Sequence, residues 1–75
     1  MELTEAVAEV LGITAEQVDD SAKPGDLENW DSRRHLQVIV RLEEVYQVSF
    51  SYSELKQLTS IGAIRRVLRD KGIQN

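Results

Sequence analysis

Apolar side chains recur along this chain with the spacing of helices that each bury one face. The first such face is formed by Leu3, Val7, Val10 and Leu11. Because residues three or four apart lie on the same side of a helix, this pattern predicts a helix from about Leu3 to Leu11. Early glutamates suit the positive end of its dipole, and Gly12 predicts its C-terminal stop.

The longest apolar pattern predicts a second helix from about Ser32 or Arg33 to Tyr46. Its expected buried positions are Leu36, Ile39, Leu42 and Tyr46, with Val38 and Val45 on an adjoining stripe. Asp31 is a suitable N-cap, because its carboxylate can accept hydrogen bonds from N–H groups of the first turn.

A short third helix and a longer fourth one are expected in the last third of the chain. Ser51 and Glu54 form a candidate capping box, which opens a short turn that ends near Leu58. The last helix is capped by Thr59 or Ser60 and continues to about Lys71, with Ile61, Ile64, Val67 and Leu68 on its buried face. No segment predicts a strand, so the expected fold class is all-α. We expect a small bundle of three main helices plus one short helix, in a single domain over residues 1–75.

A long loop separates the first two predicted helices, roughly from Gly12 to Asp31. Structureless loops beyond about 12–15 residues are uncommon in a small domain and are often functional. Within it, Thr14–Gln17 predicts one short capped turn, and Ile13 and Val18 are expected to anchor the loop to the core. Trp30 is expected to cover one end of the bundle, although it could instead be a recognition aromatic.

Composition excludes several kinds of site. The chain has 75 residues, no cysteine and one histidine, so it has no disulfide or thiolate metal site, and a zinc site is not expected. A domain this small has little room for a deep catalytic cleft beside its core. No basic and apolar leader precedes the first helix, and no apolar run approaches the roughly 18 residues that span a membrane, so we expect a cytoplasmic protein.

Charge is divided unevenly along the chain. Residues 1–31 carry nine acidic side chains and one lysine, whereas residues 32–75 carry eight basic and four acidic side chains. The overall charge is −4 at pH 7, and the basic side chains form no continuous run. This distribution argues against nucleic acid as the main partner and makes a small helical DNA binder the least favoured interpretation.

The order of these features resembles the acyl carrier proteins over essentially the whole chain. The residues that carry the resemblance are Asp31-Ser32, Leu42-Glu43-Glu44 followed by Tyr46, Phe50 with Glu54 behind it, and Thr59 to Ile64. The resemblance implies an acyl-carrier-protein-like bundle that catalyses nothing itself. It also implies that a phosphopantetheinyl transferase attaches 4′-phosphopantetheine from coenzyme A to Ser32, with Asp31 as its acidic neighbour.

The implied arm would carry an acyl group as a thioester and present it to a loading enzyme, synthase or transferase. A serine hydroxyl is a poor nucleophile without a base or metal. The only histidine, His35, lacks the partners of a catalytic histidine and is expected to be exposed or partly packed, so activation must come from the transferase. We expect a monomer with no membrane or nucleic-acid partner.

The chain departs from the family immediately after the serine. Where the family usually has leucine, this chain has Arg33 and then Arg34, and two cations in a first turn oppose the helix dipole. Arg33 could select a dedicated partner or pair with the phosphate of the arm. Alternatively, both arginines are solvated and Arg33 lays its stem over Trp30.

The second helix is less acidic than is usual in the family, where this face docks on basic partner patches. The partner-binding residues implied by the resemblance are Arg33, Arg34, Gln37, Val40, Arg41, Glu43 and Glu44. The alternative interpretation of the two glutamates is surface solubility. The family also admits an acyl chain between its second and third helices, which here implies a lining of Val38, Leu42, Phe50, Leu55 and Ile61, unless these residues form an ordinary core.

The low acidity of the second helix favours a specialised carrier over a primary fatty-acid carrier. An aminoacyl or hydroxyacyl cargo, or a peptidyl carrier role, stays open at this point. Arg33 also leaves open a carrier-fold interaction module that is never modified.

Overall fold

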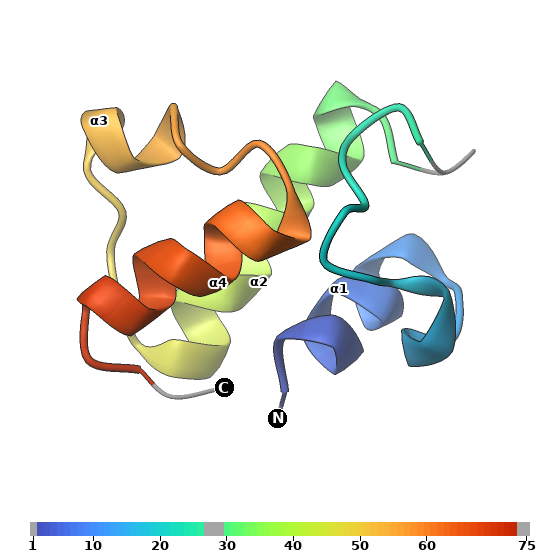
Figure 1. Ribbon diagram of the computed structural model, residues 1–75, viewed down its shortest axis with the longest axis horizontal. Coiled ribbons are helices and arrows are strands. Elements are labelled where there is room, and N and C mark those ends of the chain that lie inside the picture. The colour runs from blue at the N-terminus through green and yellow to red at the C-terminus, as the bar shows by residue number, and fades with distance from the viewer. Residues whose placement is uncertain (1, 27–29, 74–75) are drawn as a thin grey trace.

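The computed structural model describes residues 2–26 and 30–73. Its helical elements are α1 (Leu3–Leu11), the 3-10 turn η1 (Ala15–Gln17), α2 (Ser32–Tyr46), α3 (Tyr52–Leu55) and α4 (Ile61–Asp70) (Figure 1). The described residues form no strand, which confirms the all-α expectation of three main helices and one short one. None of the helices among them is long and apolar enough to cross a membrane.

Helix α1 begins and ends where the apolar pattern predicts. Glu2 and Glu5 form a capping box, in which the Glu2 backbone N–H donates to Glu5 Oε1 at 3.0 Å. The helix ends at Gly12, whose φ of 72° lies in the left-handed region that glycine adopts without strain. The buried face packs against α2 and carries Leu3, Ala6, Val7, Ala8 and Leu11.

Helix α2 also has its predicted bounds, but its buried face is narrower than expected. Val38, Ile39 and Leu42 are buried, whereas Leu36 is 63% exposed. The prediction that Leu36 is buried was therefore wrong. At 3.6 residues per turn, Leu36 lies about 120° around the helix from Leu42, beyond the edge of the buried stripe. Leu36 instead faces solvent.

Helix α3 is shorter than predicted. The Ser51–Glu54 capping box forms, with the Ser51 N–H donating to Glu54 Oε1 at 2.8 Å, but the helix ends at Leu55 instead of near Leu58. Beyond it, the Leu58 N–H bonds to the carbonyl three residues back at 3.3 Å, as in a tighter turn. This turn places Leu58, which is 1% exposed, in the core.

The loop after α1 is held against the start of α4. Val18 and Ala22 are buried, and the Ile61 and Gly62 N–H groups donate to the carbonyls of Ala22 and Asp20, each at 2.9 Å. A Cβ on Gly62 would lie 3.1 Å from the Asp20 carbonyl oxygen, so glycine permits this close approach. The loop thus joins the core through its own backbone as well as its apolar side chains.

Candidate functional site

Ser32 is the first residue of α2 and is exposed to solvent. Asp31 precedes it in an extended conformation, and its Oδ1 accepts a hydrogen bond from the Arg34 backbone N–H at 2.8 Å. This is the N-cap that the sequence predicts, and it fixes the point at which the helix begins. The Ser32 hydroxyl therefore lies at the positive end of a 15-residue helix, beside N–H groups that have no acceptor within the helix.

A contact between Trp30 and His35 holds the backbone that leads to this serine. The Trp30 ring is 1% exposed, and its Nε1–H donates to His35 Nδ1 at 3.2 Å, with ring centroids 5.8 Å apart. Burial lowers the pKa of His35, while a backbone hydrogen bond with Leu58 acts in the opposite direction. His35 is partly packed, as expected, and its Nδ1 is occupied by the indole, so it is not placed to act as a base for Ser32.

Two of the three arginines in α2 contact α1. Arg34 Nη1 donates to the Val10 carbonyl oxygen at 2.8 Å, where a cation stabilises the negative end of α1. Arg41 Nη2 lies 2.8 Å from Glu9 Oε1 in an ion pair. Arg33 is exposed and makes no hydrogen bond or ion pair with any residue that the structure describes. Arg34 is also exposed, as the solvated alternative expects, but its guanidinium has a structural contact with α1 that Arg33 lacks.

The two glutamates late in α2 also differ. Glu43 is half-buried, and its Oε2 accepts a hydrogen bond from the Phe50 backbone N–H at 3.0 Å. This contact ties the end of α2 to the segment that leads into α3. Glu44 is exposed, so only this second carboxylate is fully available to a partner.

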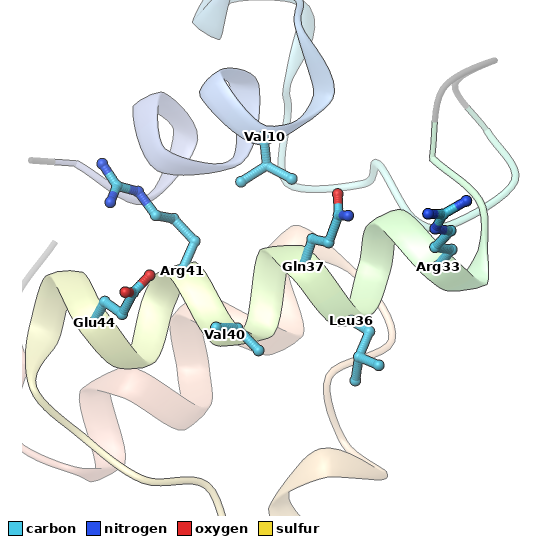
Figure 2. A pocket seen from close by; sticks show the side chains of 7 residues that line it. All are labelled: Val10, Arg33, Leu36, Gln37, Val40, Arg41 and Glu44. Atoms are coloured by element: carbon cyan, nitrogen blue, oxygen red, sulfur yellow. The ribbon is translucent and has the colours of Figure 1, made fainter.

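A groove of about 510 Å³ lies where α1 meets the outer face of α2 (Figure 2). Its lining consists of Val10, Arg33, Leu36, Gln37, Val40, Arg41 and Glu44. Five of these are residues that the sequence assigned to partner binding. Val10 packs partly against the core, as its helical spacing predicts, and it also borders the groove. Leu36 was missed as a surface residue because helical spacing alone placed it in the core; its four-residue spacing to Val40 was the available signal for a second apolar face.

A comparison with known protein families shows the family of the chain. A scan against protein-family models matches residues 2–68 to the phosphopantetheine attachment site family. The chain belongs to this family of phosphopantetheine carriers. No curated protein matches its sequence significantly. As a carrier domain it is not a catalyst, and its prosthetic group is 4′-phosphopantetheine.

The start of α2 fits such a group. The first turn of α2, which the structure describes completely, carries no acidic side chain, and the Asp31 carboxylate is engaged by the Arg34 N–H. A phosphodiester on the Ser32 Oγ would face free N–H groups and the exposed Arg33, a favourable setting for an anion. No group of three or more His, Asp or Glu side chains gathers to hold a metal among the described residues.

The expected acyl-lining residues of the carrier lie away from the groove. Val38, Leu42, Phe50 and Ile61 are buried in the shared core, and Leu55 is 37% exposed on α3. None of them lines the groove, which lies on the α1 side of α2. Their role in holding a cargo stays a prediction.

Proposed function

We propose that Ser32 is the attachment residue of this carrier. The observation that carries the proposal is the exposed Ser32 hydroxyl at the N-terminus of α2, inside the region that matches the family. In the transfer, Ser32 Oγ forms a bond to the phosphorus of the phosphopantetheine moiety, the pyrophosphate bond of coenzyme A breaks, and adenosine 3′,5′-bisphosphate leaves. The hydroxyl proton passes to a base of the transferase, because His35 is not placed to accept it.

We further propose that the loaded carrier presents an acyl, aminoacyl or hydroxyacyl thioester to partner enzymes. The chain has no cysteine, so the thiol that forms the thioester belongs to the arm. Tethering raises the local concentration of the cargo near an enzyme that has docked on the carrier. The chain acts as a monomer with a transferase, a loading enzyme and a synthase or acyl transferase as successive partners.

A specialised pathway is favoured over primary fatty-acid synthesis. Gln37 is neutral, Arg41 is paired with Glu9, and Glu43 is engaged by the backbone, so Glu44 is the main free acid on the outer face of α2 among the described residues. Such a face offers little to a strongly basic partner surface. A peptidyl carrier remains the nearest alternative within the family.

Co-expression with a broad-range phosphopantetheinyl transferase, followed by intact-mass measurement, tests the attachment residue. We expect the mass of one phosphopantetheinyl group to be added to the wild type and to Ser53→Ala, which removes another exposed serine. Ser32→Ala should gain no mass. A gain in Ser32→Ala would overturn the assignment. If neither this transferase nor those of the source organism add mass, the carrier-fold interaction module that Arg33 favours becomes the better interpretation.

The cargo class can be read from the modified protein. Holo-carrier is incubated separately with an adenylating enzyme plus amino acids and with an acyltransferase plus acyl-coenzyme A donors. A mass gain that hydroxylamine removes indicates a thioester. Gain with amino acids only would support the peptidyl carrier alternative.

A further inference from the structure

The groove between α1 and α2 exposes two neighbouring large apolar side chains of α2. Leu36 is 63% exposed and Val40 is 50% exposed, and they follow each other by one turn of α2. Val10 of α1 borders the same groove (Figure 2). Exposed apolar surface rimmed by polar side chains is typical of a contact site for another protein.

The ends of the groove carry opposite charges. Arg33 lies at the Ser32 end, and Glu44 lies at the other, about 16 Å away along the helix axis at 1.5 Å per residue. Both side chains are exposed, and neither makes a hydrogen bond or ion pair within residues 2–26 and 30–73. The groove is therefore positive beside the serine and negative at its far end.

The middle of the groove is electrically balanced by α1. Arg41 is paired with Glu9 at 2.8 Å, and Gln37 is neutral. The ion pair with Glu9 thus neutralises Arg41, the second cation of the groove. Arg33 remains as the cation available to an incoming carboxylate.

We propose that this groove binds a segment of the phosphopantetheinyl transferase that has an apolar centre, a carboxylate at the Ser32 end and a cation at the Glu44 end. The proposal rests on the proposed function and specifies the chemistry of the partner. Charge complementarity sets the direction of the segment, because the reverse orientation would place like charges together at both ends. Contact with Leu36 and Val40 supplies the apolar burial, and Val10 brings α1 into the interface.

Modification kinetics with the phosphopantetheinyl transferase of the source organism test this inference, since that enzyme must reach Ser32. We expect Arg33→Glu to raise KM about tenfold, because a carboxylate would face a carboxylate. The increase in KM should become larger as the salt concentration falls, since salt screens this repulsion. Arg66→Glu on α4 is the matched control, since it changes net charge equally at an exposed position outside the groove, and its KM should stay within about twofold. Leu36→Ser should raise KM more than Leu55→Ser on α3.

Two results would overturn the inference. One is equal KM values for Arg33→Glu and Arg66→Glu, and the other is a lower KM for Arg33→Glu, which would place a cation of the partner at the Ser32 end. Circular dichroism melts confirm that each variant is folded. Failure of the proposed function is distinguishable, because the wild type would then gain no mass at all.

Discussion

Replacing His35 with phenylalanine tests how the loop before Ser32 is held. In the wild type, the buried Trp30 indole donates its N–H to His35 Nδ1 at 3.2 Å, and the two rings are 5.8 Å apart and tilted by 40°. Phenylalanine keeps an aromatic ring at this position but has no acceptor. The substitution therefore leaves the indole N–H without the His35 partner and removes the backbone hydrogen bond with Leu58, while it preserves most of the packing.

The expected loss of stability is large for this domain. A buried donor that loses its acceptor costs about 1–3 kcal/mol. A chain of 75 residues has a total free energy of unfolding of about 4–11 kcal/mol at typical values per residue. The melting temperature should fall by about 4–24 °C, since each kcal/mol corresponds to roughly 4–8 °C in a domain of this size. His35→Gln, whose amide oxygen can accept a hydrogen bond, should lose less.

The same pair makes stability depend on pH. Burial lowers the pKa of His35 below its ordinary value of 6.5, so the unfolded chain takes up a proton at a higher pH than the folded chain. The free energy of unfolding is therefore highest above about pH 6.5 and falls as the pH drops through the lowered pKa. Protonated His35 could no longer accept the Trp30 N–H. The hydrogen bonds that lower the pKa values of Asp19 and Glu54 act nearer pH 4, outside this window.

Urea unfolding followed by circular dichroism at about pH 7.5 and about pH 5.5 measures both effects. The wild type should lose stability between the two values, and His35→Phe should lose much less. The reasoning is refuted if His35→Phe is within about 0.5 kcal/mol of the wild type at the higher pH, or if both proteins respond equally to acid.

Three further changes test the roles that the structure gives to residues of α2. Glu43→Ala removes the acceptor of a backbone N–H and should cost about 1–2 kcal/mol, whereas the exposed Glu44→Ala should change stability by less than about 0.5 kcal/mol in the same thermal melts. Arg34→Met removes the hydrogen bond to the last turn of α1 and should cost about 0.5–1.5 kcal/mol, with the earliest loss of hydrogen-exchange protection in α1. Leu42→Ala should cost about 2–5 kcal/mol and Leu36→Ala very little; equal costs would contradict the observed burial.

The sequence predicted the elements whose signals are local. The bounds of α1 and α2 follow from apolar spacing together with Gly12 and Asp31, and these signals lie within a few residues of each helix end. The capping boxes were predictable for the same reason. The end of α3 was not predictable from local signals. It depends on the burial of Leu58 in the core, which is decided by packing across the whole bundle.

The polar contacts of the site could not be predicted for a related reason. Arg34 and Arg41 contact residues that lie 24 and 32 positions earlier, and spacing along one helix contains no information about such partners. Leu36 illustrates the limit of the apolar pattern itself. Its three-residue spacing to Ile39 fits a buried stripe, but the same spacing also fits a residue just beyond the stripe's edge, and only the packed structure separates the two.

Arg33 differs from the other two arginines of α2 in its contacts. A cation in the first turn opposes the helix dipole and costs about 0.3–1 kcal/mol. For Arg34 this cost is offset by the bond to the last turn of α1, and Arg41 lies too far along the helix to incur it. Arg33 incurs the cost without a compensating contact to any described residue, while it lies next to the exposed serine and at one end of an apolar groove. An unfavourable cation in the first turn with no compensating contact inside the fold is expected where binding supplies the compensation. The compensating carboxylate or phosphate should therefore belong to a bound group or partner.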